Sequence, residues 1–262
     1  MIFAGVDVGS TTTKIVLMDE NGEIRGSLLG PTGAEHRSRS KEVLEKACLQ
    51  AGIGPDQVDY TVATGYGRIN VPYADRQITE ITCHAQGVLH FFPEAKSVID
   101  IGGQDCKGIK IRNGKVDNFV MNDKCAAGTG RYLEVTAQTL GIPLEKLGEV
   151  SLTSSHPAQI SNTCTVFAEQ EMIGKIASGT PVEDVVAGIH EAIARRVFGL
   201  LEKIKIQPEI VFTGGGAKNI GIRNALERLL KTTLSIPPID PQLVGAAGAA
   251  LLAIKFKAKN HE

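Results

Sequence analysis

The sequence predicts an α/β protein built from two related lobes. A buried strand, an Asp-x-Gly turn, a second strand and a hairpin occur twice, beginning near residues 3 and 97. Segments with the periodicity of amphipathic helices follow each set of strands. A repeated pattern of this kind indicates a duplicated unit, and 262 residues with 42% hydrophobic content are enough to bury a core and form two lobes. We place the N-terminal lobe at residues 1–95 and the C-terminal lobe at 96–262.

The N-terminal lobe is predicted to begin with three strands in residues 2–30. A Gly/Ser/Thr turn joins the first two strands, and the letters ENGE at residues 20–23 indicate a hairpin before the third. Helical periodicity predicts a helix over residues 38–51 and another over 81–89, with a glycine-ended strand over 58–67 between them. This lobe therefore places its first polar turn at the end of its first strand.

The C-terminal lobe repeats the strands, with a hairpin at Asn113-Gly114. Helices are expected after Cys125, after Cys164, and over residues 182–203. A strand ending in glycines, a helix and a final small-residue helix follow, at residues 208–216, 219–231 and 243–257. We expect the final helix to pack back on the N-terminal lobe.

Charge and composition exclude several classes of partner. A formal net charge of -1 and the lack of a long Lys/Arg run give no footprint for nucleic acid or an anionic membrane. The chain begins without a signal-peptide pattern, and no stretch approaches the roughly 20 apolar residues of a membrane span. An odd set of five widely spaced cysteines argues against a disulfide framework. We therefore expect a cytoplasmic protein without nucleic-acid or membrane partners.

The first polar turn, DVGSTTTK, has the composition of a phosphate-binding loop. Asp7 ends a buried strand and Gly9 allows a sharp turn. Backbone N–H groups and hydroxyls converging on an anion would hold phosphate oxygens, and Lys14 adds charge. The expected donors are Ser10, Thr11, Thr12 and Thr13.

The second turn, DIGGQDCK, repeats this arrangement in the other lobe with Asp100, Gly102, Gly103 and Gln104. The aspartates of the two turns, Asp7 and Asp100, suit a hydrated Mg²⁺, because that ion prefers oxygen ligands and retains water. Gln104 could orient an attacking water, as polar side chains do in phosphoryl transfer. We therefore take the two aspartates and Gln104 as the candidate catalytic residues.

A third turn, TGGGAKN, precedes the predicted helix at 219–231. Its glycines, Gly214, Gly215 and Gly216, permit flat approach of the backbone to a ring, and a helix N-terminus favours anions. We assign this turn to the adenosine end of a nucleotide. Each turn alone could be only a tight strand connection, whereas three in this order indicate a nucleotide site.

The three turns together resemble the phosphate-1, phosphate-2 and adenosine motifs of the actin, hexokinase and Hsp70 ATPase superfamily, and PQLVGAAGAALLA resembles its last connecting helix. The resemblance implies two duplicated lobes around a nucleotide cleft. It also implies that Lys218 and Gln242 lie near the adenine and that Glu134 accepts from the ribose hydroxyls. For these three side chains, a solvated polar position on a helix is the alternative.

Two of the cysteines, Cys125 and Cys164, precede predicted helices. The positive end of a helix stabilises a thiolate, and Ser161, Asn162 and Thr163 are available as caps for the second helix. Two cysteines cannot complete the four-thiolate shell of an iron–sulfur cluster, but two chains of a homodimer could supply four. The alternative, a cysteine packed as a small apolar residue, stays open on physical grounds.

The residue sequences of five motifs favour an iron–sulfur cluster. NDKCAAGTGR, SNTCTVFAEQE, ATGYGR, DIGGQD and AGIH resemble the ATP-dependent activators of 2-hydroxyacyl-CoA dehydratases, a family related to the ATPase subunits of benzoyl-CoA reductase. The resemblance implies a homodimer bridged by one [4Fe–4S] cluster, with Cys125 and Cys164 as ligands. It also implies that ferredoxin or flavodoxin supplies an electron to the cluster. ATP hydrolysis would then drive this electron to a partner dehydratase or related reductase, which uses it to form a ketyl radical.

Two other functions fit parts of the pattern. A sugar or acyl kinase of the same superfamily would need a substrate pocket and a general base, and an actin-like scaffold would need head-to-tail surfaces. A kinase has no use for Cys125 and Cys164 at matched helix starts. Cys83 beside His84 could suggest a metal pair, but neighbours on a helix point to different faces, so we expect packed side chains.

Overall fold

The computed structural model describes residues 1–33, 35–161 and 164–259. The chain forms two compact units. The first unit consists of Met1–Ala95, Ile111–Val116 and Pro237–Glu262, and the second consists of Lys96–Lys110 and Asp117–Ile236. Among the described residues, no helix has the length and apolar character needed to cross a membrane.

The first unit contains a mixed five-stranded sheet in the order β3-β2-β1-β4-β5. The strands are β1 (Ile2–Val8), β2 (Thr12–Asp19), β3 (Ile24–Pro31), β4 (Val58–Thr64) and β5 (Arg76–Gln77). The first three strands pair antiparallel, and β4 lies parallel to β1 on its other side. The carboxyl ends of β1 and β4 therefore meet at one edge of the sheet.

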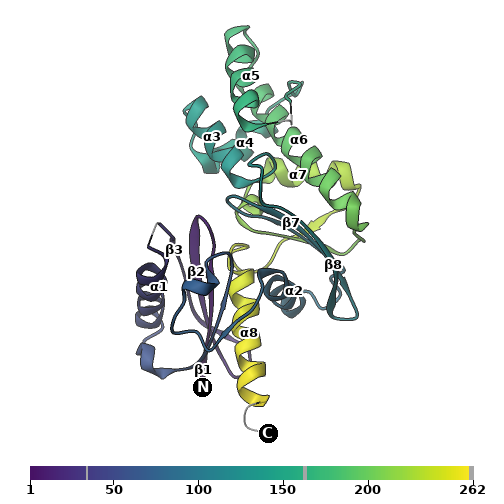
Figure 1. Ribbon diagram of the computed structural model, residues 1–262. Helices are drawn as coiled ribbons and strands as arrows, with labels where there is room; N and C mark the ends of the chain where they lie inside the picture. Colours follow the sequence, from purple (N-terminus) through teal and green to yellow (C-terminus); the bar gives the residue numbers. More distant parts are fainter. Residues whose placement is uncertain (34, 162–163, 260–262) are drawn as a thin grey trace. The chain divides into compact units, whose positions relative to one another are not determined.

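Helices cover both faces of this sheet (Figure 1). They are α1 (His36–Gln50), α2 (Glu80–Phe91) and α8 (Val244–Lys259). Side chains of β2 alternate between the faces, because Ile15 and Leu17 pack in the cluster that includes α1, whereas Val16 and Met18 pack against α8. Burial on both faces explains why β2 is apolar at successive positions.

Glycines allow α8 to lie directly on β1 and α2. A Cβ added at Gly5 of β1 would lie 1.8 Å from the Ala246 carbonyl oxygen, and one at Gly248 of α8 would lie 1.7 Å from the Cys83 carbonyl oxygen. Neither position can hold a larger residue without moving the backbone of the helix. The small-residue composition of α8 is therefore a packing requirement of the first unit.

The second unit contains a mixed five-stranded sheet in the order β10-β9-β6-β7-β8. The strands are β6 (Ser97–Ile101), β7 (Cys106–Arg112), β8 (Lys115–Asn122), β9 (Ile210–Thr213) and β10 (Leu234–Ser235). The helices are α3 (Gly130–Leu140), α4 (Leu147–Leu152), α5 (Thr165–Ala177), α6 (Val182–Leu201) and α7 (Ile220–Leu230). One large apolar cluster joins β6 and β9 to these helices, with Phe212 and Ile99 among its buried members.

The α/β fold class and the repeated strand pattern predicted from the sequence are confirmed. The hairpin between β7 and β8 turns at Asn113 and Gly114, whose φ angles are 52° and 70°, as a tight hairpin requires. The sequence missed β5, β10 and α4. Two-residue strands and a six-residue helix are too short to give a periodic signal.

Candidate functional site

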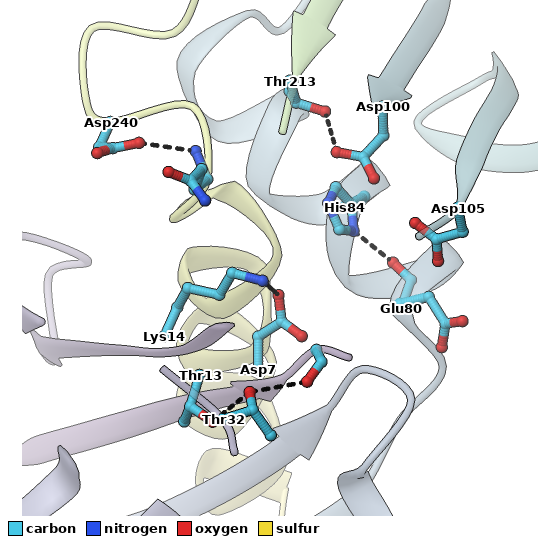
Figure 2. A network of polar contacts seen from close by, with 12 residues as sticks. Asp7, Thr13, Lys14, Thr32, Glu80, His84, Asp100, Asp105, Thr213 and Asp240 are labelled. Atoms are coloured by element: carbon cyan, nitrogen blue, oxygen red, sulfur yellow. Dashed lines mark hydrogen bonds and ion pairs between the residues drawn. The ribbon is translucent and has the colours of Figure 1, made fainter. Parts of the chain in front are cut away.

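The first polar turn places a lysine opposite the aspartate at the end of β1. Asp7 and Lys14 are cross-strand neighbours on β1 and β2, and their side chains form an ion pair of 3.4 Å (Figure 2). The turn is closed by the Gly9 N–H, which donates to the Thr12 carbonyl at 3.0 Å. The carboxylate is thereby held at the edge of the sheet beside an ammonium group.

The second turn has the same geometry in the second unit. Asp100 and Lys107 are neighbours on β6 and β7, and their ion pair is also 3.4 Å long. The Gly102 N–H donates to the Asp105 carbonyl at 3.0 Å. Lys107 additionally donates to the Asp105 carboxylate at 2.6 Å, so one buried ammonium group serves two carboxylates.

The hydroxyls of the first turn have different surroundings. Ser10 and Thr11 are exposed. Thr13 is fully buried, and its hydroxyl lies 3.0 Å from that of Thr32, which in turn donates to the Gly9 carbonyl at 2.8 Å (Figure 2). The Thr13 hydroxyl therefore stabilises the turn from its buried side, whereas Ser10 and Thr11 are the exposed donors at its tip.

A Thr-Gly pair at the end of the neighbouring parallel strand lies against each aspartate. Asp7 pairs in register with Thr64 of β4, and Asp100 pairs with Thr213 of β9. The next residues, Gly65 and Gly214, have φ angles of 84° and 79°. A Cβ there would lie 2.2 Å from Asp7 Oδ1 and 2.8 Å from Asp100 Oδ1, respectively. Only glycine allows such close approach of backbone to carboxylate.

The third turn lies directly on the second one. The Thr213 hydroxyl donates to Asp100 Oδ1 at 2.9 Å (Figure 2), and a Cβ at Gly216 would lie 2.6 Å from the Ile101 side chain. The turn continues as a short 3-10 helix over Gly215–Lys218 before α7. The second and third predicted turns thus form one continuous surface of the second unit.

A buried histidine anchors the helix that follows the third turn. Asn219 caps α7 by accepting from the Ile222 N–H at 3.1 Å, and its amide nitrogen lies 3.1 Å from His190 Nε2. Because the amide oxygen is used by the cap, the amide nitrogen is the donor and Nε2 the acceptor. Burial lowers the pKa of His190 to about 3, so the imidazole is neutral at ordinary pH.

The second turn is also bonded to the start of α3. The backbone N–H groups of Gly130 and Arg131 donate to the carbonyls of Gly102 and Gly103, each at 2.8 Å. The helix therefore begins on the turn that we expect to hold phosphate. The loop immediately before this helix contains Cys125.

The two candidate ligand cysteines are free and half-buried. Cys164 is the N-cap residue of α5. Cys125 lies four residues before Thr129, which is the N-cap of α3. Gly128, with φ of 90°, interrupts the helical path between them. Of the caps expected for α5, Asn162 and Thr163 lie outside the described residues, and Ser161 donates its backbone N–H to Glu171 at 2.7 Å.

The remaining cysteines are packed in the cores. Cys48, Cys83 and Cys106 are buried, and burial raises the pKa of each thiol, to about 12 for Cys83. His84 is buried and its Nδ1 lies 2.9 Å from the Glu80 carbonyl. Within the described ranges, no group of three or more His, Cys, Asp or Glu side chains is arranged to hold a metal.

The side chains expected near the ribose and adenine have separate environments. Glu134 accepts from Arg131 at 2.9 Å on the surface of α3. Lys218 and Gln104 are exposed in the third and second turns. Gln242 is half-buried, and its backbone N–H donates to Asp240 at 3.0 Å (Figure 2).

Sequence reasoning missed several residues that shape the two turns. Lys107 could have been found, because it follows Asp100 by seven positions, as Lys14 follows Asp7. The matching Thr64-Gly65 and Thr213-Gly214 steps were also visible as repeated letters. Thr32 could not have been found from the sequence, because it reaches the first turn only through the pairing of β2 with β3.

Comparison with known proteins gives matches along nearly the whole chain. A model of the BadF/BadG/BcrA/BcrD ATPase family matches residues 4–253. The 2-hydroxyisocaproyl-CoA dehydratase activator of Clostridioides difficile is 45% identical over 256 residues, which are 97% of this chain and 95% of that protein. The (R)-2-hydroxyglutaryl-CoA dehydratase activating ATPase of Acidaminococcus fermentans is 44% identical over 259 residues, covering 97% and 98%.

Solved structures confirm the fold. The activator of the 2-hydroxyisocaproyl-CoA dehydratase from Clostridium difficile with bound ADPNP superimposes with a TM-score of 0.94 and 43% identity, covering 100% of this chain and 97% of that chain. A ROK family glucokinase from Streptomyces griseus gives a TM-score of 0.58 at 14% identity, covering 97% of this chain and 100% of that chain. The second likeness shows the fold alone, and both structures confirm the predicted actin/hexokinase-like fold.

Proposed function

Because the chain belongs to the BadF/BadG/BcrA/BcrD ATPase family, we propose that it is an ATP-hydrolysing iron–sulfur activator. It receives an electron from ferredoxin or flavodoxin and drives it to a 2-hydroxyacyl-CoA dehydratase or a related reductase. The relatives from C. difficile and A. fermentans are named as activators of such dehydratases. Their identity along the whole chain supports the same class of partner here.

The duplicated turns are the proposed phosphate sites. Backbone N–H groups at the tips, the exposed hydroxyls of Ser10 and Thr11, and Lys14 would hold the phosphates. Asp7 and Asp100 would bind a hydrated Mg²⁺ through its waters, and the exposed Gln104 would orient the attacking water. Thr12 and Gly103 are the remaining proposed donors. Gly9 and Gly102 are proposed to shape the two sites by closing the turns with their N–H groups, and Thr13 supports the first turn.

The third turn is the proposed adenosine site. Gly214 and Gly216 allow the turn to pack against Asp100 and Ile101, and the half-buried Gly215 between them would offer its backbone to a ring without a side chain in the way. Lys218 and Gln242 are proposed to contact the adenine. Glu134 would accept from the ribose hydroxyls after exchanging its bond with Arg131.

The cysteines fit the proposed cluster in the chemistry that they offer. Both thiols of the Cys125 and Cys164 pair are free and partly accessible, whereas the other three are buried. Cys164 occupies the N-cap position of α5 without a capping side-chain hydrogen bond, so its sulfur would lie near the positive end of a helix. Two thiolates from each chain of a homodimer would complete the four ligands of one [4Fe–4S] cluster, which supplies one-electron transfer.

One observation carries the proposal: the second phosphate turn is hydrogen-bonded to the start of α3, the helix that follows the loop with Cys125. Gly130 and Arg131 at the start of α3 bond to Gly102 and Gly103. A change in the turn when the γ-phosphate leaves would therefore act directly on the first residues of α3. Asn122 bonds to the Cys125 carbonyl at 2.9 Å from the end of β8, so the loop is held at both ends.

The first experiment is iron and acid-labile sulfide analysis of protein purified without oxygen, with native mass on the same sample. We expect about two iron and two sulfide per chain in a dimer. Cys125→Ser and Cys164→Ser should each lose the metal, and Cys48→Ser should keep it. ATP turnover should increase electron delivery to the partner dehydratase.

Metal-free protein that hydrolyses ATP, even after anaerobic reconstitution, would contradict the proposal. A small-molecule kinase would then be the next candidate. The glucokinase likeness does not favour that function at present, because it shows the fold alone.

A further inference from the structure

Thr64 at the end of β4 is fully buried, but its hydroxyl has no hydrogen-bond partner among the described residues. Buried hydroxyls nearly always find a partner. An unpaired one costs free energy that a valine of the same shape would avoid. The hydroxyl therefore points to an interaction that forms only in another state of the protein.

The equivalent hydroxyl of the second unit shows which interaction this position can make. Thr213 is the partner of Asp100 in the parallel register of β6 and β9, just as Thr64 is the partner of Asp7 in that of β1 and β4. The Thr213 hydroxyl donates to Asp100 Oδ1 at 2.9 Å (Figure 2). Within the described part of the first unit, Thr64 makes no such bond to Asp7.

Asp7 lies within reach of the Thr64 hydroxyl. In-register residues on neighbouring strands point to the same face of the sheet, and the strands lie about 4.8 Å apart. Asp7 Oδ1 also lies against Gly65, the residue after Thr64, because a Cβ added there would be 2.2 Å from this oxygen. A change of the Thr64 side chain to another staggered rotamer moves the hydroxyl to a new position on Cβ, and so can direct it to Asp7.

The surroundings of the hydroxyl offer only a weak partner. Cys83 of α2 packs in the same buried cluster as Val62, which lies two residues before Thr64 on the same face of β4. Burial raises the pKa of the Cys83 thiol to about 12, and the Thr64 hydroxyl and the Asp7 carboxylate are smaller causes that act on it. A thiol is a weak donor and a weak acceptor, so Cys83 does not replace a bond to a carboxylate.

Nucleotide binding would leave Asp7 in need of this bond. The ion pair between Asp7 and Lys14 is 3.4 Å long, whereas a strong charge-assisted hydrogen bond is about 2.8 Å. Lys14 Nζ also lies over the turn, 2.9 Å from a Cβ added at Gly9. Phosphate oxygens in the turn would therefore attract the ammonium group away from Asp7, and the carboxylate would require another donor.

We propose that Thr64 is a positioning residue of the nucleotide site and that its hydroxyl donates to the Asp7 carboxylate in the nucleotide-bound protein. The inference rests on the proposed function. The bond fixes the orientation of Asp7 toward the nucleotide, as the Thr213 hydroxyl fixes that of Asp100. It also explains why a hydroxyl that is unpaired in the free protein occupies this position.

Thr64→Val tests the proposal, because it removes the hydroxyl and retains the shape of the side chain. The dissociation constant of ADPNP with Mg²⁺, measured by isothermal titration calorimetry, should rise about tenfold, which is close to the lower end of what a hydrogen bond to a charged group contributes. The stability of the nucleotide-free protein in urea should stay the same or increase, because no bond is lost there. Thr64→Ser keeps a hydroxyl and should bind ADPNP as the wild type does.

Thr213→Val is the matched control. It removes a bond to Asp100 that is already formed without nucleotide, so it should lower the stability of the nucleotide-free protein in urea and also weaken ADPNP binding. The contrast between the two variants separates a bond that forms on nucleotide binding from one that forms on folding.

The outcomes also separate this inference from the proposed function. Wild-type affinity for ADPNP in Thr64→Val, or a loss of stability in its nucleotide-free form, would overturn the role of Thr64 and leave the ATPase proposal intact. Wild-type protein that binds no ADPNP would overturn both.

Discussion

The backbone N–H of Arg131 donates to the carbonyl of Gly103 at 2.8 Å. This bond joins the first turn of α3 to the second phosphate-type turn, and the adjacent Gly130 makes an equivalent bond to Gly102. Backbone bonds of this kind do not depend on side-chain rotamers, so a displacement of the turn moves the helix start with it. The first prediction follows from this junction.

Gly130→Ala should uncouple ATP hydrolysis from the proposed electron transfer. The new Cβ would lie 3.0 Å from the Gly102 oxygen and 3.4 Å from the Gly103 Cα, so the junction must loosen by a few tenths of an ångström to admit it. We expect the number of ATP molecules used per electron delivered to rise several-fold, measured as phosphate release against reduction of the partner.

Gly199→Ala on α6 is the control, because nothing lies within 4 Å of its added Cβ. It should leave the ratio unchanged and stabilise the helix slightly, since alanine favours helix over glycine. An unchanged ratio in Gly130→Ala would show that the junction does not transmit the nucleotide state.

The sequence predicted the elements that repeat a pattern and missed those that depend on tertiary pairing. Asp7 and Asp100 were found because each ends an apolar strand before a glycine turn. The path from Cys125 to α3 could not be derived from a helical pattern, because it depends on the positive φ of Gly128. The role of Thr32 depends on which strands become neighbours, and short-range periodicity does not determine that.

Lys107→Met should destabilise the protein more than Lys14→Met. Lys107 is 5% exposed and neutralises Asp100 and Asp105, whereas Lys14 is paired with Asp7 at 14% exposure. Removing one partner of a buried ion pair leaves uncompensated charge, so we expect a loss of about 3 kcal/mol in the free energy of unfolding for Lys107→Met. Urea unfolding without nucleotide measures both variants.

The added change Asp105→Asn should recover part of this loss, because it removes one of the two carboxylates left without the ammonium group. Equal losses in Lys107→Met and Lys14→Met would mean that Asp105 adds nothing to the pair.

In His190→Gln, the free energy of unfolding should decrease less in acid than it does in the wild type. The folded-state pKa of about 3 lies below the ordinary 6.5, so between these values the unfolded chain binds a proton that the folded chain does not. The free energy of unfolding is therefore not reduced by this group above about pH 6.5. Below that value it decreases by about 1.4 kcal/mol per pH unit. Glutamine retains an acceptor for the Asn219 amide without titrating.

Urea unfolding at several pH values between 7 and 4 gives the two slopes. If His190→Gln keeps the wild-type slope, the imidazole is protonated in the folded protein at these pH values.

The cysteines should divide into two classes under alkylation of the cluster-free protein. Cys125 and Cys164 are half-buried, whereas Cys83 and Cys106 are buried with raised pKa values. At pH 8, a thiol of pKa about 12 is ionised to about one part in ten thousand. Iodoacetamide should therefore label the first pair, as peptide mapping by mass spectrometry would show, and reach the others only in urea.

Assembly of the cluster should then protect Cys125 and Cys164 together. A ligated sulfur has its lone pairs engaged by iron, so its reaction with iodoacetamide slows while the thiols of the apo protein react freely. Protection of only one cysteine would assign the other to a different role, and labelling of both at the apo rate in iron-loaded protein would place the metal elsewhere. Because buried thiols stay unlabelled in either state, Cys83 and Cys106 serve as internal controls for unfolding during the reaction.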